Sequence, residues 1–121
     1  GSITQKLLDH YSLGILTVFL EKNFFQNFKF KKDYSVIGDF DFFISLSQKF
    51  KIASIQEPLA FYRIHNSNFS NKKNVDYVEE LEKWINENDK TFSDKGYSLQ
   101  KQKILLLKLK IKSFFKKFFS F

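Results

Sequence analysis

The chain has 121 residues, 17 of them phenylalanine and none cysteine, and it carries a formal net charge of +7. This length allows one domain with one main core, and the lack of cysteine excludes a disulfide scaffold, a thiol nucleophile and a thiolate zinc site. With 43% hydrophobic residues the chain is too apolar for global disorder. Its apolar runs are shorter than the ~18 residues that a membrane-spanning helix needs.

The N-terminal part is predicted to alternate short helices and strands. Leu13–Leu20 is β-branched and apolar, which is typical of a buried strand. It separates one or two helical turns at Thr4–Tyr11 from a short helix at Glu21–Phe28. A loop or irregular strand is expected at Lys29–Ile37.

A more regular helix is predicted over Phe40–Phe50. Its apolar residues recur at helical spacing, and Asp39 is well placed as the N-cap. Two short strands follow at Ile52–Ile55 and Leu59–Ile64, separated by a proline that pushes the preceding residue out of the helical region. Asn66–Lys73, rich in asparagine and serine, is predicted to be a polar loop.

The C-terminal part predicts a helical hairpin. The apolar residues of an otherwise charged helix fall on one stripe: Val75, Val78, Leu81, Trp84 and Ile85. A break that carries Gly96 follows at Thr91–Ser98, and Leu99–Phe121 is the second helix. Short strands and helices followed by this hairpin make the predicted fold class α+β.

Several motifs occur in order in the middle of the chain. Residues 37–46 read IGDFDFFISL, residues 57–65 read EPLAFYRIH, and Asn68 and Ser70 follow. These segments resemble the acceptor-side half of family-2 glycosyltransferases of the GT-A fold. In that family a Glu-Asp-aromatic-Asp segment opens a helix, and a Glu-Pro-Leu-x-x-Tyr-Arg-x-His strand follows it. Ile3–Leu20 is similar to the segment that precedes the acidic motif.

The resemblance implies roles for particular residues. Asp39 would be the catalytic base that takes the proton from an acceptor hydroxyl as its oxygen attacks the sugar. Asp41 and Arg63 would bind the acceptor or support the motif. His65 would lie near the donor diphosphate or its metal, and it is the one candidate metal ligand in this chain.

Each of these residues also has a structural interpretation, which the sequence leaves open. Asp39 would then only cap its helix, and Asp41 would be a solvated carboxylate of the first turn. Arg63 would form a buried ion pair with a carboxylate, and His65 would be a structural hydrogen-bonding group.

The resemblance also divides the chain. Residues 1–2 are expected to be a cloning remnant, residues 3–70 the acceptor-side half of the catalytic domain, and residues 71–121 C-terminal helices with a basic amphipathic tail. Gly38 and Ser45 depart from the family pattern, which often has Glu and Arg at these positions.

By the same resemblance the full-length protein would be an inverting, hexosyltransferase-like enzyme of bacterial polysaccharide biosynthesis. It would move a sugar from a nucleotide-sugar to a glycan or lipid-linked acceptor, with a divalent metal (Mg or Mn) held by an Asp-x-Asp motif of the nucleotide-binding half. No such motif precedes Asp39. The chain is therefore expected to be a C-terminal fragment that holds no cofactor and is inactive alone.

The excess positive charge lies in the last predicted helix. Leu99–Phe121 has seven lysines and no acidic residue. The apolar residues on one face of this helix are Ile104, Leu107, Ile111, Phe114, Phe115 and Phe118. The pattern is typical of a helix in a membrane interface, so residues 99–121 are predicted to bind an anionic surface, on the inner, cytoplasmic face of the membrane.

The same apolar stripe would equally suit packing on the rest of the chain or on a second copy in a homo-oligomer. The alternative function is therefore a non-catalytic module for membrane association or oligomerisation that acts through this tail. Nucleic acid is not an expected partner, because the chain has a single arginine, no recognisable nucleic-acid-binding module and no basic patch on its first half.

Overall fold

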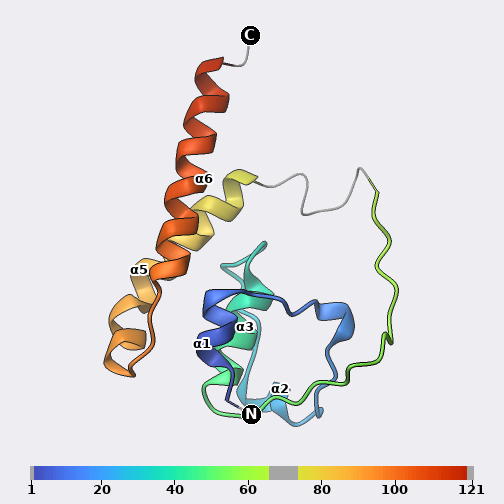
Figure 1. The fold of residues 1–121 in the computed structure, drawn as a ribbon. Helices are drawn as coiled ribbons and strands as arrows, with labels where there is room; N and C mark the ends of the chain where they lie inside the picture. The colour runs from blue at the N-terminus through green and yellow to red at the C-terminus, as the bar shows by residue number, and fades with distance from the viewer. Residues whose placement is uncertain (1, 66–73, 120–121) are drawn as a thin grey trace.

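The computed structural model describes residues 2–65 and 74–119, and its regular elements over these residues are helices (Figure 1). In chain order they are α1 Thr4–Asp9, the 3-10 helix η1 Ile15–Thr17, α2 Phe24–Asn27, α3 Gly38–Ser47, α5 Asn74–Asp94 and α6 Gln100–Phe119. No strand occurs within the described residues, so the α+β prediction is wrong and this part of the chain is all-α. The loop predicted at Asn66–Lys73 lies outside the described residues.

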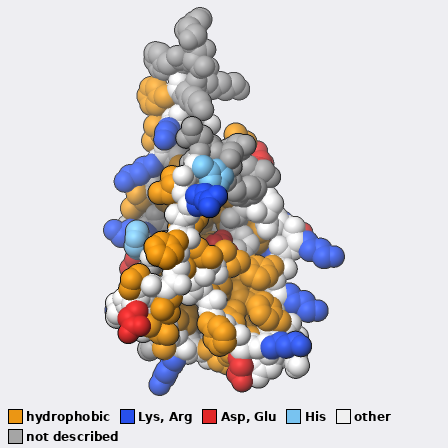
Figure 2. Space-filling view, turned by 90° about the vertical axis from the view of Figure 1, so that its right-hand side faces the viewer, with side chains coloured by type: hydrophobic (Ala, Val, Ile, Leu, Met, Phe, Trp, Pro, Cys, Tyr) orange, Lys and Arg blue, Asp and Glu red, His pale blue; other side chains and the backbone are white. Residues whose placement is uncertain are grey.

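The predicted strands fail for a common physical reason. Leu13–Leu20 bends through η1 and leaves Phe19 97% exposed. Ile52–Ile55 and Leu59–Ile64 belong to one irregular segment, green in Figure 1, in which Phe61 is fully exposed. A strand needs a neighbouring backbone to complete its hydrogen bonds, and the described chain brings none beside these segments. Hydrophobic side chains gather on this side of the molecule (Figure 2).

The main core is centred on Trp84 of α5, which is 1% exposed. Its indole packs edge-on against Phe40 of α3, with ring centroids 4.8 Å apart, and lies 5.5 Å from the ring of Phe92. α1 contacts both α3 and α6, and α5 packs along α6. Because the buried cluster draws on both halves of the chain, the first half and the hairpin share one core. The boundary predicted at residue 70 stays a prediction.

α3 is buried on a second side as well. Phe42, Phe43 and Leu46 form a smaller cluster with side chains from residues 11–28. The Phe42 ring stacks on that of Phe30, with ring centroids 4.4 Å apart. A helix covered on both sides is apolar all round, which explains the dense run of phenylalanines in α3.

The C-terminal helical hairpin forms as predicted, but its break is shorter. α5 continues to Asp94, into the break expected at Thr91–Ser98. The Tyr97 N–H then donates to the Phe92 carbonyl at 2.9 Å. Gly96 has a φ of +79°, where only glycine avoids a steric cost, and this residue lets the chain turn back into α6.

Candidate functional site

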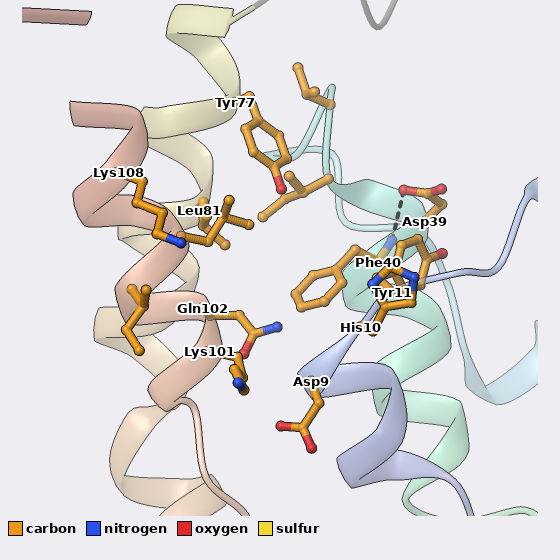
Figure 3. Close-up of a pocket in the computed structure, with 14 residues that line it drawn as sticks. Asp9, His10, Tyr11, Asp39, Phe40, Tyr77, Leu81, Lys101, Gln102 and Lys108 are labelled. Atoms are coloured by element: carbon orange, nitrogen blue, oxygen red, sulfur yellow. Dashed lines mark hydrogen bonds between the residues drawn. The ribbon is translucent and has the colours of Figure 1, made fainter. Parts of the chain in front are cut away.

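A pocket of about 610 Å³ opens where the end of α1, the start of α3 and the two hairpin helices meet (Figure 3). Apolar side chains in its lining include Ile37, Phe40 and Leu81. Its polar side chains are Asp9, His10, Tyr11, Asp39, Tyr77, Lys101, Gln102 and Lys108. The predicted catalytic base thus lies in a pocket assembled from four helices.

Asp39 lies in the first turn of α3 and is partly buried. Its Oδ1 accepts a hydrogen bond from the Phe40 N–H at 2.8 Å, the dashed line in Figure 3. The N-cap position belongs to Ile37, which makes no side-chain capping bond, so the prediction of Asp39 as N-cap is wrong. The carboxylate is still favoured here, because the N-terminal end of a helix attracts negative charge.

Two tyrosine hydroxyl groups lie near the Asp39 carboxylate. Burial raises the pKa of Tyr11, and the negative charge of Asp39 raises it further. Burial also raises the pKa of Tyr77, and the negative charge of Asp39 adds to this effect. Both phenols therefore stay protonated at neutral pH and can donate hydrogen bonds. The Tyr11 hydroxyl is buried close to the Asp39 carboxylate and makes no well-aligned hydrogen bond within the described part of the chain.

α6 forms the opposite wall of the pocket. Lys101 and Lys108 line it two turns apart, and the Gln102 Nε2 donates to the carbonyl of Leu8. Gln102 is only 6% exposed, yet its Oε1 has no partner among the described residues. Figure 3 shows these α6 side chains across the pocket from Asp39. With Asp9 and Asp39 on the facing side, the lining carries two lysines and two aspartates and suits a ligand rich in hydroxyl groups, whose negative charge would lie toward α6.

Glu80 of α5 holds the turn that leads into α3. Its Oε1 accepts from the N–H and the hydroxyl of Ser35, each at 2.8 Å, and its Oε2 accepts from the N–H groups of Val36 and Ile37 at 2.9 and 3.0 Å. Burial alone would raise the pKa of Glu80, but these hydrogen bonds outweigh it and lower the pKa. Because the turn directly precedes α3, α5 determines where Asp39 enters the pocket.

Asp41 contacts the core and does not line the pocket. Its Oδ1 accepts from the Trp84 Nε1 at 2.8 Å and from the Lys31 Nζ at 3.1 Å. A buried carboxylate is costly without such partners. At 4% exposure Asp41 is not the solvated first-turn carboxylate of the structural interpretation. It ties α3 to α5, and no contact with the pocket supports its predicted acceptor-binding role.

Arg63 and His65 lie at the end of the irregular segment and are exposed. Neither is among the described residues that line the Asp39 pocket, and Figure 1 shows their segment well apart from α6. Across residues 2–65 and 74–119, no group of three or more His, Cys, Asp or Glu side chains is arranged to hold a metal ion. The described residues therefore offer no such site for the Mg or Mn that the resemblance places in a nucleotide-binding half.

Several pocket residues were missed from the sequence, and two of them had a detectable signal. Gln102 lies three residues after Leu99 and four before Leu106, on the face of α6 that packs inward. Tyr77 lies four residues before Leu81, on the apolar stripe of α5. A polar group on an apolar helical face marks a packed or functional position. The residues contributed by α1 and the α6 lysines had no such signal.

Comparison with known proteins finds no similar family, protein or structure. No protein-family model matches the chain, and no curated protein or solved structure matches it either. The resemblance to family-2 glycosyltransferases therefore rests on the motifs within residues 3–70.

Proposed function

We propose that this chain is the acceptor-side part of an inverting glycosyltransferase, with Asp39 as the catalytic base. One observation carries the proposal: Asp39, to which the motif assigns this role, lines a pocket of about 610 Å³, within the usual size of ligand sites. The phenol of Tyr77 would hold a neighbouring hydroxyl group of the acceptor, and the Tyr11 phenol behind it would keep the Asp39 carboxylate in place. Lys101 and Lys108 would balance negative charge on it.

In the proposed reaction an acceptor hydroxyl enters the pocket beside Asp39. Its oxygen attacks the anomeric carbon of the donor sugar on the face opposite the nucleoside diphosphate. As the new carbon–oxygen bond forms, the bond to the diphosphate breaks, its electron pair leaves with the diphosphate, and the hydroxyl proton passes to the Asp39 carboxylate. A weakly basic group suffices because the hydroxyl becomes acidic only as the bond forms.

The exposed apolar segments support the view that a further part of the enzyme covers this one. Phe19, Leu59 and Phe61 are each at least 71% exposed. A domain that works by itself rarely exposes large apolar side chains together in this way. We propose that the nucleotide-binding half covers them, and we expect no sugar-nucleotide turnover by the 121-residue chain alone.

Asp39→Asn in the full-length enzyme tests the proposal, with Asp33→Asn as the matched control. Asparagine keeps an acceptor for the Phe40 N–H but cannot take the proton, so kcat is expected to fall about 10²–10⁴-fold. Asp33 is exposed, pairs with Lys83 and does not line the pocket, so its variant should release nucleoside diphosphate at the original rate. An unchanged release rate in the Asp39 variant would show that Asp39 is not the base.

A further inference from the structure

α6 has two apolar faces, and one of them packs inward. The inward face consists of Leu106 and Leu109 around the buried Gln102, and Leu99 directly before the helix continues it. On the opposite face Ile104, Leu107 and Ile111 are between 41% and 59% exposed, and Phe114 and Phe115 continue the stripe. The sequence left open that this stripe packs on the rest of the chain. Within the described residues it does not, because its side chains remain exposed. None of the described helices is long and apolar enough to cross a bilayer.

Lysines follow both edges of this exposed stripe. On one edge Lys103 pairs with Asp89 at 2.8 Å, and Lys110 pairs with Glu82. On the other edge are Lys101, Lys108 and Lys112, for which the described residues provide no ion pair. One row of positive charge is thus neutralised by α5, while the other row is exposed along the rim of the pocket and has no ion pair among the described residues.

A second copy of the chain is the competing occupant of the stripe. The row of Lys101, Lys108 and Lys112 is not neutralised by α5, so an antiparallel pairing of two stripes would bring the uncompensated row of one copy beside that of the other. Like charges juxtaposed at an interface are unfavourable. A membrane with anionic headgroups instead offers opposite charge to the uncompensated row and acyl chains to the stripe. Charge complementarity therefore favours the lipid surface.

We propose that α6 lies along the surface of a membrane that contains anionic lipid, with Leu107 and Ile111 at the boundary between headgroups and acyl chains. Ile104, Lys101 and Lys108 belong both to this surface and to the pocket lining, so the pocket would lie beside the membrane. The proposal needs the exposed stripe and its lysines and does not depend on catalysis, so the two proposals can fail separately.

Flotation with lipid vesicles tests the proposal on the intact 121-residue chain. Vesicles of phosphatidylcholine mixed with phosphatidylglycerol are expected to bind it, and vesicles of phosphatidylcholine alone to bind it much less. Leu107→Gln combined with Ile111→Gln should lower the bound fraction more than about tenfold. Both side chains lie outside the core, so the fold should persist. Deletion of α6 is unsuitable because its inward face belongs to the core.

A charge variant tests the lysines separately and keeps the proposal testable if the stripe variant fails to fold. Lys108→Gln with Lys112→Gln should weaken binding to anionic vesicles roughly thirtyfold. Lys32→Gln with Lys90→Gln removes the same charge from exposed positions outside α6 and should have a much smaller effect. Unchanged binding by both α6 variants would overturn the proposal. A dimer in sedimentation that the stripe variant abolishes, with no flotation, would assign the stripe to a second copy instead.

Discussion

Replacement of Glu80 by glutamine tests how the hairpin positions Asp39. Each Glu80 oxygen accepts two hydrogen bonds from the turn before α3, at 2.8–3.0 Å. Glutamine keeps one acceptor oxygen and presents an NH₂ group to the other pair of donors. The Ser35 hydroxyl can turn and accept from this NH₂ group, but the Ser35 N–H loses its acceptor and the remaining bonds lose the charge of the carboxylate. At this partly exposed site we expect the free energy of unfolding to fall by about 2 kcal/mol.

The measurement is urea unfolding followed by tryptophan fluorescence, with Glu79→Gln as the control. Glu79 is the neighbouring exposed carboxylate, so its variant should unfold with nearly unchanged stability. Folding lowers the pKa of Glu80 below its ordinary 4.5. The Glu80 carboxylate therefore stabilises the fold above that value, and the contribution is lost as pH falls through the lower folded pKa.

The difference between the wild type and Glu80→Gln should accordingly shrink in acid. A difference below about 0.5 kcal/mol at pH 7 would refute the reasoning, because ordinary surface substitutions have effects of that size. A difference that persists unchanged at low pH would refute it equally, since the lost interaction would then not involve the charge of Glu80.

Two further substitutions test the core and the hairpin. Trp84→Phe removes the indole N–H and leaves the buried Asp41 carboxylate with Lys31 as its partner. The free energy of unfolding, measured by urea denaturation followed by circular dichroism, should therefore fall by about 2–3 kcal/mol. Equal stability would contradict the role of the indole. Gly96→Ala adds a Cβ that meets no atom within 4 Å but stands at a φ of +79°, so it should cost about 1 kcal/mol in the same assay. A more stable alanine variant would mean that the turn has another backbone conformation.

The hairpin was predictable because helix formation is local. The apolar stripe of α5 recurs every three or four residues, and that spacing requires no knowledge of the rest of the chain. Predicting the strands correctly would have required knowing which other segments of the chain lie beside them. Leu13–Leu20 and Leu59–Ile64 have the composition of buried strands, but a strand forms only beside another strand, and the described chain supplies none.

Of the residues that line the candidate site, the sequence predicted one. The motif singled out Asp39, and this residue does line a pocket. Its surroundings come from α1, α5 and α6, which are brought together by tertiary packing and not by sequence spacing. Tyr11 is near in space but distant in the chain, and Lys101 and Lys108 looked like surface charges of a tail. Asp41 was predicted to support Asp39 in binding the acceptor, but residues two apart in a helix point in different directions, and Asp41 enters the core.

The shared core has a consequence for how such a chain diversifies. Trp84, Glu80 and the α6 wall of the pocket all belong to the hairpin, while the motif carboxylate belongs to the first half. A genetic exchange that replaces the hairpin would therefore alter the stability of the fold, the position of Asp39 and the chemistry of the opposite wall in one event. Hairpin and motif are expected to evolve as a matched pair, so chimaeras between distant versions should fail unless the contacts of Glu80 and Trp84 are kept.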